Sequence, residues 1–250
     1  MDNNRAMGII PARYDSVRLP GKPLKLINGK TMILRVVEQA EKSKMLSGIL
    51  VATDDKRIFD HLTSFGKKVV MTKKNIRTGT DRCYEAVKGI DCDIVVNIQG
   101  DEPLIDPDLI DRLIMSLRKE KEAVCTTPVR AVKENEEVKD PACVKVVFDR
   151  KGYAMYFSRT DIPYHKNGPA FYYQHIGIYA YRADFLKTFI NSDSTILEVS
   201  ESLEQLRILE NGYKIKCVKV NYESIGVDTL EDLERVREKI IVTEGKNEDT

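Results

Sequence analysis

The 250-residue chain contains no apolar run of the roughly 18 residues that a membrane-spanning helix requires. Its first residues, Met1–Arg5, lack the basic segment, apolar segment and cleavage site of a secretory signal. The five cysteines are scattered, odd in number and never arranged as Cys-x-x-Cys, which argues against a disulfide framework or a structural zinc site. We therefore expect a cytoplasmic protein with reduced thiols and no membrane partner.

An excess of charge of either sign is also missing. The chain has 40 Lys and Arg against 39 Asp and Glu, a formal net charge of +1. A general nucleic-acid binder would show a basic excess, so we expect no nucleic-acid partner, while a local basic cleft for one anionic ligand remains open. With 32% charged and 42% hydrophobic residues, the composition is typical of a globular protein rather than a disordered one.

Two common phosphate-binding motifs are absent. Gly29-Lys30-Thr31 resembles the end of a P-loop, but the position that needs the first glycine is Leu24. The Gly-x-Gly-x-x-Gly fingerprint of dinucleotide-binding enzymes does not occur. No Ser–His–Asp or Cys–His triad is evident either. The sequence therefore favours neither a Walker-type ATPase, a dehydrogenase nor a hydrolase with a protein nucleophile.

Strand and helix patterns alternate through the first half of the chain. Apolar residues at 32, 33, 36, 37 and 40, for example, follow helical spacing. The predicted strands are 7–10, 48–53, 67–71 and 93–98, and the predicted helices are 32–42, 56–64, 80–88 and 107–119. Such alternation indicates a mostly parallel sheet, with binding residues at the carboxyl ends of its strands.

The second half has a more mixed pattern. A hairpin is predicted from strands 143–148 and 153–157, followed by strands 177–181 and 214–220. The predicted helices are 197–210, closed by Gly212, and 229–241, with a frayed tail from Thr243. We expect one α/β domain over residues 1–250, with an inserted, partly antiparallel subregion at about 125–190.

A cationic loop follows the first predicted strand. Residues 11–24 contain Arg13, Arg18 and Lys22 together with three prolines and one glycine. Such a loop can surround an anion with backbone N–H groups and cationic side chains, although a solvated basic loop is the alternative. A second segment, 78–82, opens a helix, where Thr80 could be the N-cap and Gly79 would let a ligand approach the backbone.

Carboxylates suitable for a divalent cation occur in two places. Asp101 and Glu102 come directly after the fourth predicted strand, and Asp228 precedes the last helix. Mg²⁺ typically takes one or two protein carboxylates and completes its shell with phosphates and water. Surface acidity and helix capping at Thr229 are the alternatives. The Asp-x-Asp spacing of Asp91 and Asp93 lies at the wrong end of its strand, and we interpret it as structural.

Polar groups that could hold a polyol lie in the second half, in residues 173–182 and 201–207. His175 is the one titratable group among them suited to catalysis near neutral pH. A single histidine beside a strand is, however, more often a packed polar residue than a catalyst. Both interpretations of His175 remain open from the residues alone.

Taken together, the segments resemble the CMP-Kdo synthetases, which are 3-deoxy-manno-octulosonate (Kdo) cytidylyltransferases, from Ile9 to about Glu238. The resemblance rests on ordered motifs, namely the loop ending Arg18–Leu24, Val51–Asp54, Thr78–Arg82, Asn97–Pro103, His175–Tyr179, Glu201–Arg207 and Gly226–Thr229. It implies a Rossmann-like nucleotidyltransferase (GT-A-like) fold with a sugar-binding and dimerisation insertion, and a homodimer. The implied reaction is CTP + Kdo → CMP-Kdo + diphosphate, in lipopolysaccharide or capsule biosynthesis.

The resemblance also implies roles for particular residues. The implied catalytic residues are Arg13 and Lys22, which would grip the CTP phosphates, and Asp101 and Asp228, which would hold Mg²⁺. The implied nucleotide-binding residues are Ala12, Arg13, Lys22, Thr78, Gly79, Arg82, Gln99 and Asp101. The implied ligands of the sugar acid are Gln99, Arg159, His175, Tyr179, Glu204 and Gln205, with Gln99 reaching both substrates.

The chain departs from the family pattern in two segments. Residues 75–78 read Asn-Ile-Arg-Thr, where the family commonly has a histidine and a serine. The segment 164–169, which follows Arg159, is shorter than the corresponding segment of many relatives. An 8-amino-Kdo or a sialic-type sugar is therefore an alternative substrate, and a non-catalytic CTP-binding protein is the alternative from another functional class.

Overall fold

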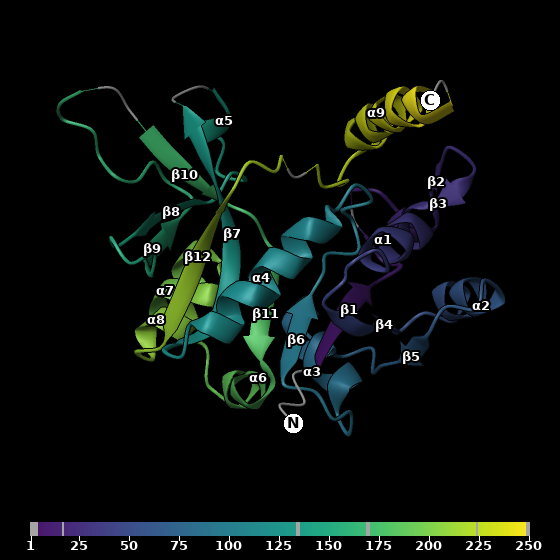
Figure 1. Cartoon of the computed structure of the whole chain (residues 1–250), viewed down its shortest axis with the longest axis horizontal. Helices are drawn as coiled ribbons and strands as arrows, with labels where there is room; N and C mark the ends of the chain where they lie inside the picture. The colour runs from purple at the N-terminus through teal and green to yellow at the C-terminus, as the bar shows by residue number, and fades with distance from the viewer. Residues whose placement is uncertain (1–4, 17, 134–135, 169–170, 224, 249–250) are drawn as a thin grey trace. The chain divides into compact units, whose positions relative to one another are not determined.

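The computed structural model describes residues 5–16, 18–133, 136–168, 171–223 and 225–248 (Figure 1). The chain divides into two compact units. The terminal unit comprises Arg5–Asp91, Asn97–Asp108 and Ser224–Thr250, and the middle unit comprises Cys92–Val96 and Leu109–Glu223. The middle unit thus extends beyond the expected insertion at 125–190, and the single-domain interpretation stays a prediction.

Parallel strands form the centre of the terminal unit. Strand β1 (Ala6–Ala12) pairs with β4 (Leu46–Thr53), which pairs with β5 (Val69–Met71), and both pairings are parallel. Helices α1 (Met32–Ala40), α2 (Lys56–Ser64) and α3 (Gly79–Val87) alternate with them, which confirms the predicted α/β pattern. Ala12 lies opposite Thr53 at the carboxyl edge, where the predicted binding loops begin.

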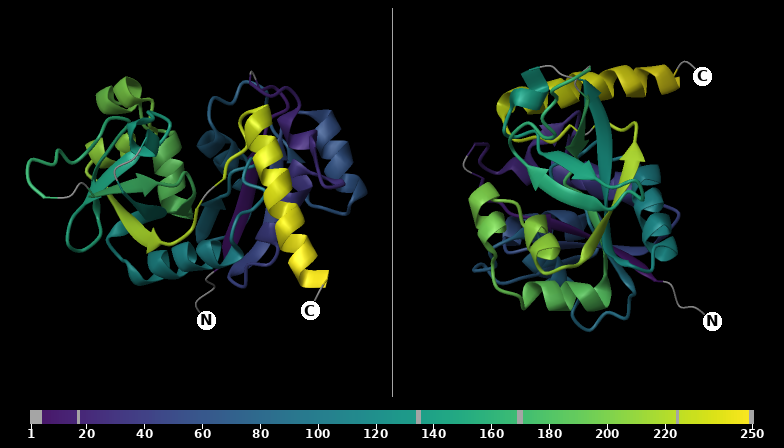
Figure 2. Two further views of the ribbon diagram at one scale, coloured as in Figure 1. Left: turned by 90° about the horizontal axis from the view of Figure 1, so that it is seen from above. Right: turned by 90° about the vertical axis from the view of Figure 1, so that its left-hand side faces the viewer.

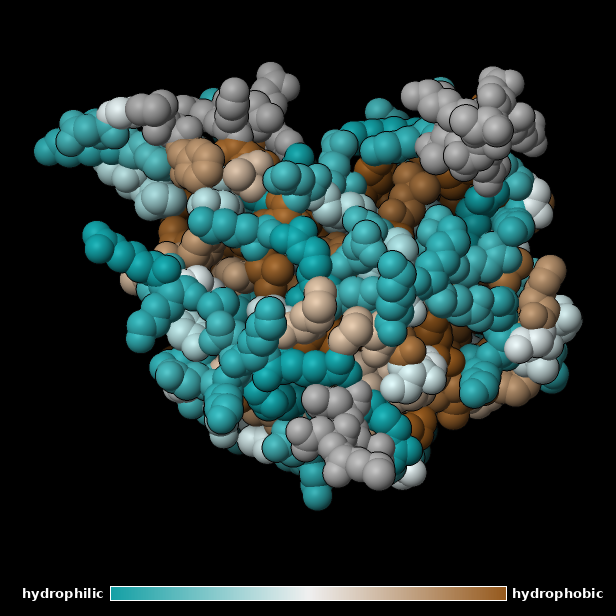
Figure 3. Space-filling model, viewed as in Figure 1, coloured by the Kyte–Doolittle hydropathy of each residue, from teal (hydrophilic) through white to brown (hydrophobic). Residues whose placement is uncertain are grey.

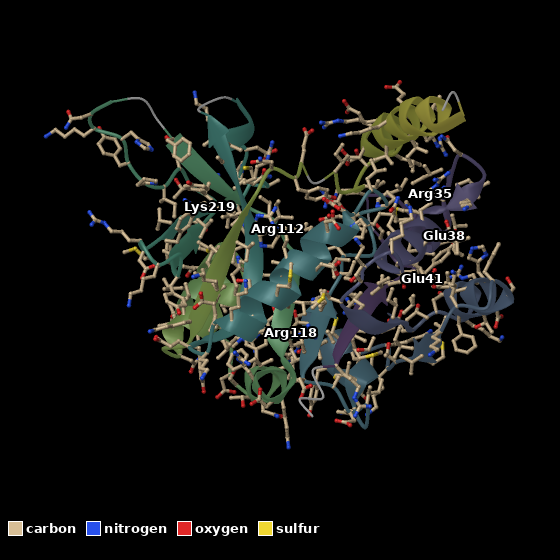
Figure 4. All side chains as sticks on the ribbon, in the orientation of Figure 1. Arg35, Glu38, Glu41, Arg112, Arg118 and Lys219 are labelled. Atoms are coloured by element: carbon tan, nitrogen blue, oxygen red, sulfur yellow. The ribbon has the colours of Figure 1, made fainter. Side chains whose placement is uncertain are left out.

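Short elements connect β1 to α1. They are the 3₁₀ helix η1 (Lys22–Leu24) and the hairpin of β2 (Leu26–Ile27) and β3 (Lys30–Thr31). Arg35 of α1, labelled in Figure 4, donates to the carbonyls of Ile27 at 2.7 Å and Asn28 at 2.9 Å. The hairpin is therefore anchored to α1.

Helix α9 (Leu230–Glu248) belongs to the terminal unit and lies beside the β2–β3 hairpin (Figure 2). The Thr229 hydroxyl accepts from the N–H of Asp232 at 3.2 Å, as the predicted N-cap requires. The apolar side of α9 packs into a buried cluster, whose members are Leu19, Ile27, Met32, Ile225, Val227, Leu233, Val236 and Ile240. The predicted end at Ile241 is wrong, because the helix continues through Thr243 to Glu248.

The middle unit contains a mixed sheet around the long strand β7 (Ala123–Lys133). Its strand order is β6-β11-β7-β10-β8-β9, and β12 also pairs with β7. The other bounds are β6 (Ile94–Asn97), β8 (Lys145–Phe148), β9 (Ala154–Ser158), β10 (Phe171–His175), β11 (Tyr179–Arg182) and β12 (Lys214–Val220). Strands β10 and β11 run antiparallel to β7, and β8 and β9 form the predicted hairpin.

The middle-unit helices differ from the predictions in three places. They are α4 (Pro107–Lys119), which begins in the terminal unit, α5 (Glu136–Lys139), α6 (Ala183–Ile190), α7 (Ile196–Glu201) and α8 (Gln205–Glu210). The single helix expected over 197–210 is wrong, because Ser202 adopts a left-handed conformation (φ 52°) and separates α7 from α8. Helices α5 and α6 were not predicted. Gly212 follows the α8 C-cap with φ 78°, as expected.

The polarity of the surface and the state of the cysteines agree with the sequence analysis. Hydrophilic side chains cover much of the face in Figure 3. None of the five cysteines, all within the described ranges, forms a disulfide bond, as predicted. Within the described ranges, every helix is too short or too polar to cross a membrane.

Candidate active site

A pocket of about 310 Å³ lies in the terminal unit, at the carboxyl ends of the strands. Six of the eight residues expected at the nucleotide line it, namely Ala12, Arg13, Lys22, Gly79, Gln99 and Asp101. The other lining residues are Pro11, Asp15, Ser16, Pro23, Arg77 and Gly100. Among these, Arg77 is a cation that we did not predict at the site, because no local pattern singles it out.

Gly100 lets the segment that carries Gln99 and Asp101 run close against the end of β1. The N–H of Ile98 donates to the carbonyl of Ile9 at 2.9 Å. A Cβ atom at Gly100 would lie 2.7 Å from the carbonyl oxygen of Pro11, closer than real Cβ contacts. The absence of a side chain at Gly100 therefore shapes this wall of the pocket.

The cationic loop is held by contacts to its own residues and to α2. Gly21 takes φ 67°, and its N–H donates to the carbonyl of Tyr14 at 3.2 Å. The guanidinium of Arg57 lies 3.3 Å from the centre of the Tyr14 ring, and Asp55 binds that guanidinium in turn. These contacts fix the loop on both sides of Val17, which itself lies outside the described residues.

Lys22 is the centre of the charged cluster. Its Nζ lies 2.8 Å from Asp101 Oδ2 and 3.0 Å from Asp228 Oδ1, although Asp228 is 206 positions away in sequence. The Lys22 side chain is 13% exposed. Burial lowers the pKa of Lys22, but the charges and hydrogen bonds of Asp101 and Asp228 outweigh burial and raise it above its ordinary value. Lys22 is therefore a charged cation held by both predicted metal carboxylates.

Backbone contacts bring the two carboxylates together. The N–H of Val227 donates to the carbonyl of Asp101 at 2.9 Å. Asp232 accepts from the N–H of Asp228 at 3.0 Å, which fixes the turn before α9. Arg18 Nη2 also lies 2.8 Å from Asp228 Oδ2. The pairing of Asp101 with Asp228 at one point is thus built into the backbone and does not depend on side-chain rotamers alone.

The remaining expected nucleotide residues have other contacts. Arg13 donates to the carbonyl of Ile76, and this bond links the cationic loop to the segment before α3. Thr78 is the N-cap of α3 and accepts from the N–H of Asp81 at 3.1 Å, so the predicted N-cap at Thr80 is wrong. Arg82 is fully buried, pairs with Asp54 at 2.8 Å and bonds to Thr72. Neither Thr78 nor Arg82 lines the pocket.

The five residues expected only at the sugar acid belong to the middle unit. His175 ends β10, is 9% exposed and shares a 3.0 Å hydrogen bond with the hydroxyl of Thr127. Its ring contacts those of Phe157 and Tyr179 at centroid distances of 5.1 and 5.3 Å. Burial lowers the pKa of His175 to about 3 and raises that of Tyr179 well above its ordinary value. Both side chains are therefore neutral near pH 7.

Glu204 and Gln205 lie at the start of α8, and Arg159 follows β9. Gln205 is 5% exposed, and its Nε2 has no hydrogen-bond partner within the described structure. A buried amide donor left without an acceptor costs about 1–3 kcal/mol. Gln205 is thus suited to donate to an oxygen of a ligand.

The neutral, buried state of His175 predicts a pH dependence of stability. Its pKa is about 3 in the folded chain and 6.5 as an ordinary value, so the unfolded state binds the extra proton within this window. We expect stability to fall with acidification by about 1.4 kcal/mol per pH unit more in the wild type than in His175→Gln. Urea unfolding at several pH values measures this difference, and parallel pH profiles for the two proteins would contradict the expectation.

Comparison with known proteins agrees with this geometry. The cytidylyltransferase family model matches residues 7–215. A 3-deoxy-manno-octulosonate cytidylyltransferase of Fusobacterium nucleatum is 50% identical over 92% of this chain and 94% of its own. The mitochondrial one of Arabidopsis thaliana is 48% identical over 93% and 82%.

Solved structures give the same result. A CMP:2-keto-3-deoxy-manno-octonic acid synthetase complexed with CTP superposes with a TM-score of 0.92 at 40% identity, covering 96% of this chain and all of its own. A putative glucose-1-phosphate thymidylyltransferase of Bacillus anthracis, at 16% identity, has a TM-score of 0.66 over 93% of this chain and 94% of its own, and shares the fold alone. The chain therefore belongs to the cytidylyltransferase family, among the 3-deoxy-manno-octulosonate cytidylyltransferases.

Proposed function

We propose that the protein transfers the cytidylyl group of CTP to a 3-deoxy-ulosonic acid and releases diphosphate. Kdo is the acid that we expect. The observation that carries this proposal is the Lys22 ammonium between Asp101 and Asp228, with Lys22 and Asp101 lining the pocket. The structurally similar synthetase complexed with CTP supports the nucleotide. The relatives' names support the acid.

The chemistry requires positioning and charge neutralisation rather than a protein nucleophile. The anomeric hydroxyl attacks the α-phosphorus, the bond to the diphosphate breaks, and the hydroxyl proton is released. Arg13 and Lys22 are the cations that neutralise the phosphates, because both line the pocket. Burial lowers the pKa of His175 to about 3, which makes its ring a weak base, so we assign it the role of orienting a hydroxyl or holding its neighbours.

The carboxylates of Asp101 and Asp228 lie 2.8 and 3.0 Å from the Lys22 ammonium, so both already converge on one positive charge. Two such carboxylates fit the needs of Mg²⁺. No group of three or more ligating side chains is found in the described part of the chain, which fits an ion that takes its other ligands from phosphates and water. We assign Asp101 and Asp228 as its protein ligands. When bound, Mg²⁺ lowers the pKa of the attacking hydroxyl and polarises the α-phosphate.

We assign the sugar acid to Arg159, His175, Tyr179, Glu204 and Gln205 of the middle unit, with Gln99 contacting both substrates. We infer that the activated sugar serves lipopolysaccharide or capsule biosynthesis, and we expect the protein to be a cytoplasmic homodimer. The segment 164–169 ends in Pro169, which lies outside the described residues. An 8-amino-Kdo or a sialic-type sugar remains the second candidate substrate class.

A diphosphate-release assay tests this function. We expect release only when CTP, Mg²⁺ and a ulosonic acid are all present, with Kdo used more efficiently than 8-amino-Kdo or N-acetylneuraminate. UTP with Kdo is the control for the base, and CTP alone is the control for hydrolysis. CTP binding without diphosphate release from any acid would instead show a nucleotide-binding protein without this activity.

A further inference from the structure

Tyr14 does not line the pocket, although its neighbours in the cationic loop do. Arg13, Asp15 and Ser16 are all lining residues. The Tyr14 ring packs instead against the guanidinium of Arg57, whose Cζ lies 3.3 Å from the ring centre. Arg57 belongs to the first turn of α2, and neither side chain of this pair, the Tyr14–Arg57 stack, lines the pocket. The loop therefore has one face for a ligand and another that contacts α2.

The same ring covers a second part of the loop. A Cβ atom at Gly21 would lie 2.9 Å from the hydroxyl oxygen of Tyr14 and 3.0 Å from its Cζ, so the absence of a side chain at Gly21 lets the ring lie against the backbone. The N–H of Gly21 also donates to the carbonyl of Tyr14 at 3.2 Å. Tyr14 directly follows Arg13, and Gly21 directly precedes Lys22. The ring thus joins the backbone beside one cation to the backbone beside the other.

Arg57 is itself held in place. Its Nε donates to Asp55 Oδ1 at 2.9 Å and its Nη2 donates to Asp55 Oδ2 at 2.6 Å, a two-bond fork that fixes the plane of the guanidinium. Asp55 is the N-cap of α2, and its own N–H donates to the hydroxyl of Thr53 at 3.2 Å, at the end of β4. The side-chain hydrogen bond from Arg57 lowers the pKa of Asp55 below its ordinary value, so the fork persists near neutral pH. A planar guanidinium held in this way is suited to stack on the face of an aromatic ring.

Helix α2 also binds the far end of the connection between β1 and α1. His61 Nε2 shares a 2.8 Å hydrogen bond with the hydroxyl of Thr31, the buried residue before α1. Contacts from one helix therefore hold this connection at Tyr14 and at Thr31, and Lys22 lies between them in sequence. Under the proposed function, Lys22 exchanges its carboxylate partners for phosphate oxygens. Such an exchange requires a side chain that moves on a backbone that stays in place.

We propose that Tyr14 and Arg57 are positioning residues, whose stack holds the cationic loop so that Arg13 and Lys22 meet the triphosphate at a set spacing. The inference rests on the proposed function, since it takes the triphosphate as the ligand of these two cations. Without the stack, the loop has to be ordered when the nucleotide binds, and this cost weakens binding. The bound nucleotide then orders the loop, so the turnover of the ternary complex changes little. The expected consequence is a loss of affinity for CTP alone.

Tyr14→Leu and Arg57→Met test the stack in the full-length protein. Each removes one partner of the ring–cation contact and leaves every residue that lines the pocket unchanged. We expect the Kd of CTP, measured by calorimetric titration without an acid substrate, and the KM for CTP to rise about fivefold in each. We expect kcat and the KM for Kdo to stay within about twofold of wild type. The double variant should add little to either single one, because each already breaks the same contact.

Tyr14→Phe is the conservative variant. Phenylalanine keeps the ring face that receives the guanidinium, so we expect it to retain wild-type affinity for CTP where leucine does not. Weakened CTP binding in Tyr14→Phe, equal to that in Tyr14→Leu, would overturn the stack as the cause.

Lys56→Met is the matched control for Arg57→Met. Lys56 is the neighbouring cation on α2, and it pairs with Asp60 at 2.7 Å rather than with the loop. We expect its Kd for CTP to stay near wild type. An equal rise in Lys56→Met would show a general charge effect, and an unchanged Kd in Tyr14→Leu or Arg57→Met would overturn the positioning role. A lower kcat with an unchanged KM for CTP would also overturn it, because a merely less stable protein gives that result.

Two further results separate the possible failures. A wild-type protein that binds CTP but releases no diphosphate with any acid refutes the proposed function, while the titration of CTP still decides the role of the stack. A wild-type protein that does not bind CTP refutes both. If Tyr14→Leu does not fold, as judged by its thermal midpoint, Arg57→Met decides the question, because the Arg57 side chain is 57% exposed.

Discussion

Replacing Asp101 by Asn is expected to lower kcat for cytidylyl transfer by about 1000-fold, with little change in folding. Asparagine keeps the size of the side chain but removes the charge that Lys22 and the assigned cation share. Asp101 is only partly buried, with 30% of its side chain exposed, so its loss costs little stability. Diphosphate release at saturating CTP and Kdo measures the effect, and circular dichroism checks the fold.

Asp60→Asn is the control for Asp101→Asn. Asp60 also pairs with a lysine, Lys56, at 2.7 Å in the terminal unit, but both side chains are more than half exposed on α2. We expect Asp60→Asn to turn over as wild type does. Turnover of Asp101→Asn within about tenfold of wild type would refute its assignment as a metal ligand.

Replacing Arg82 by Met is expected to lower the free energy of unfolding by about 3 kcal/mol. Methionine fills a similar volume but leaves the Asp54 carboxylate, 16% exposed, without its partner, and also removes the bond to Thr72. Urea denaturation measures the change. The structure therefore predicts a loss of stability, where the family resemblance alone led us to expect a contact with the nucleotide.

Lys56→Met is the matched control for Arg82→Met. It also breaks an ion pair between a cationic residue and an aspartate, here Lys56 and Asp60. This pair lies on the surface, where such pairs contribute at most about 1 kcal/mol. If the free energy of unfolding of Arg82→Met equals that of Lys56→Met, and its KM for CTP is raised, then Arg82 serves the nucleotide and not the fold.

The helices that alternate with the parallel strands of the terminal unit were predictable because each has a clear apolar stripe. Helix α1, for example, buries Met32, Ile33, Val36, Val37 and Ala40, the five positions whose spacing indicated it. The break at Ser202 was not predictable, because neither glycine nor proline marks it. The residue just before the break, Glu201, is bonded to Arg159, which lies 42 positions earlier, and no local pattern connects the two.

The site was predictable as a set of residue types but not as an arrangement. The position of Asp101 after an apolar strand indicated a binding edge. The meeting of Asp228 with Lys22 depends on the cluster that packs α9 against Leu19 and Met32, and no local pattern reports that cluster. For Arg82 the missing information was its partner Asp54, 28 positions earlier.

The bonds of Lys22 to Asp101 and Asp228 have a thermodynamic consequence. If Lys22 neutralises a triphosphate and Asp101 and Asp228 hold Mg²⁺, as we propose, both partners favour breaking the same two bonds of Lys22. Occupation by either partner therefore lowers the free-energy cost of admitting the other, and by linkage the two effects are equal in size. Until then, Lys22 together with Arg18 balances the charge of the two carboxylates.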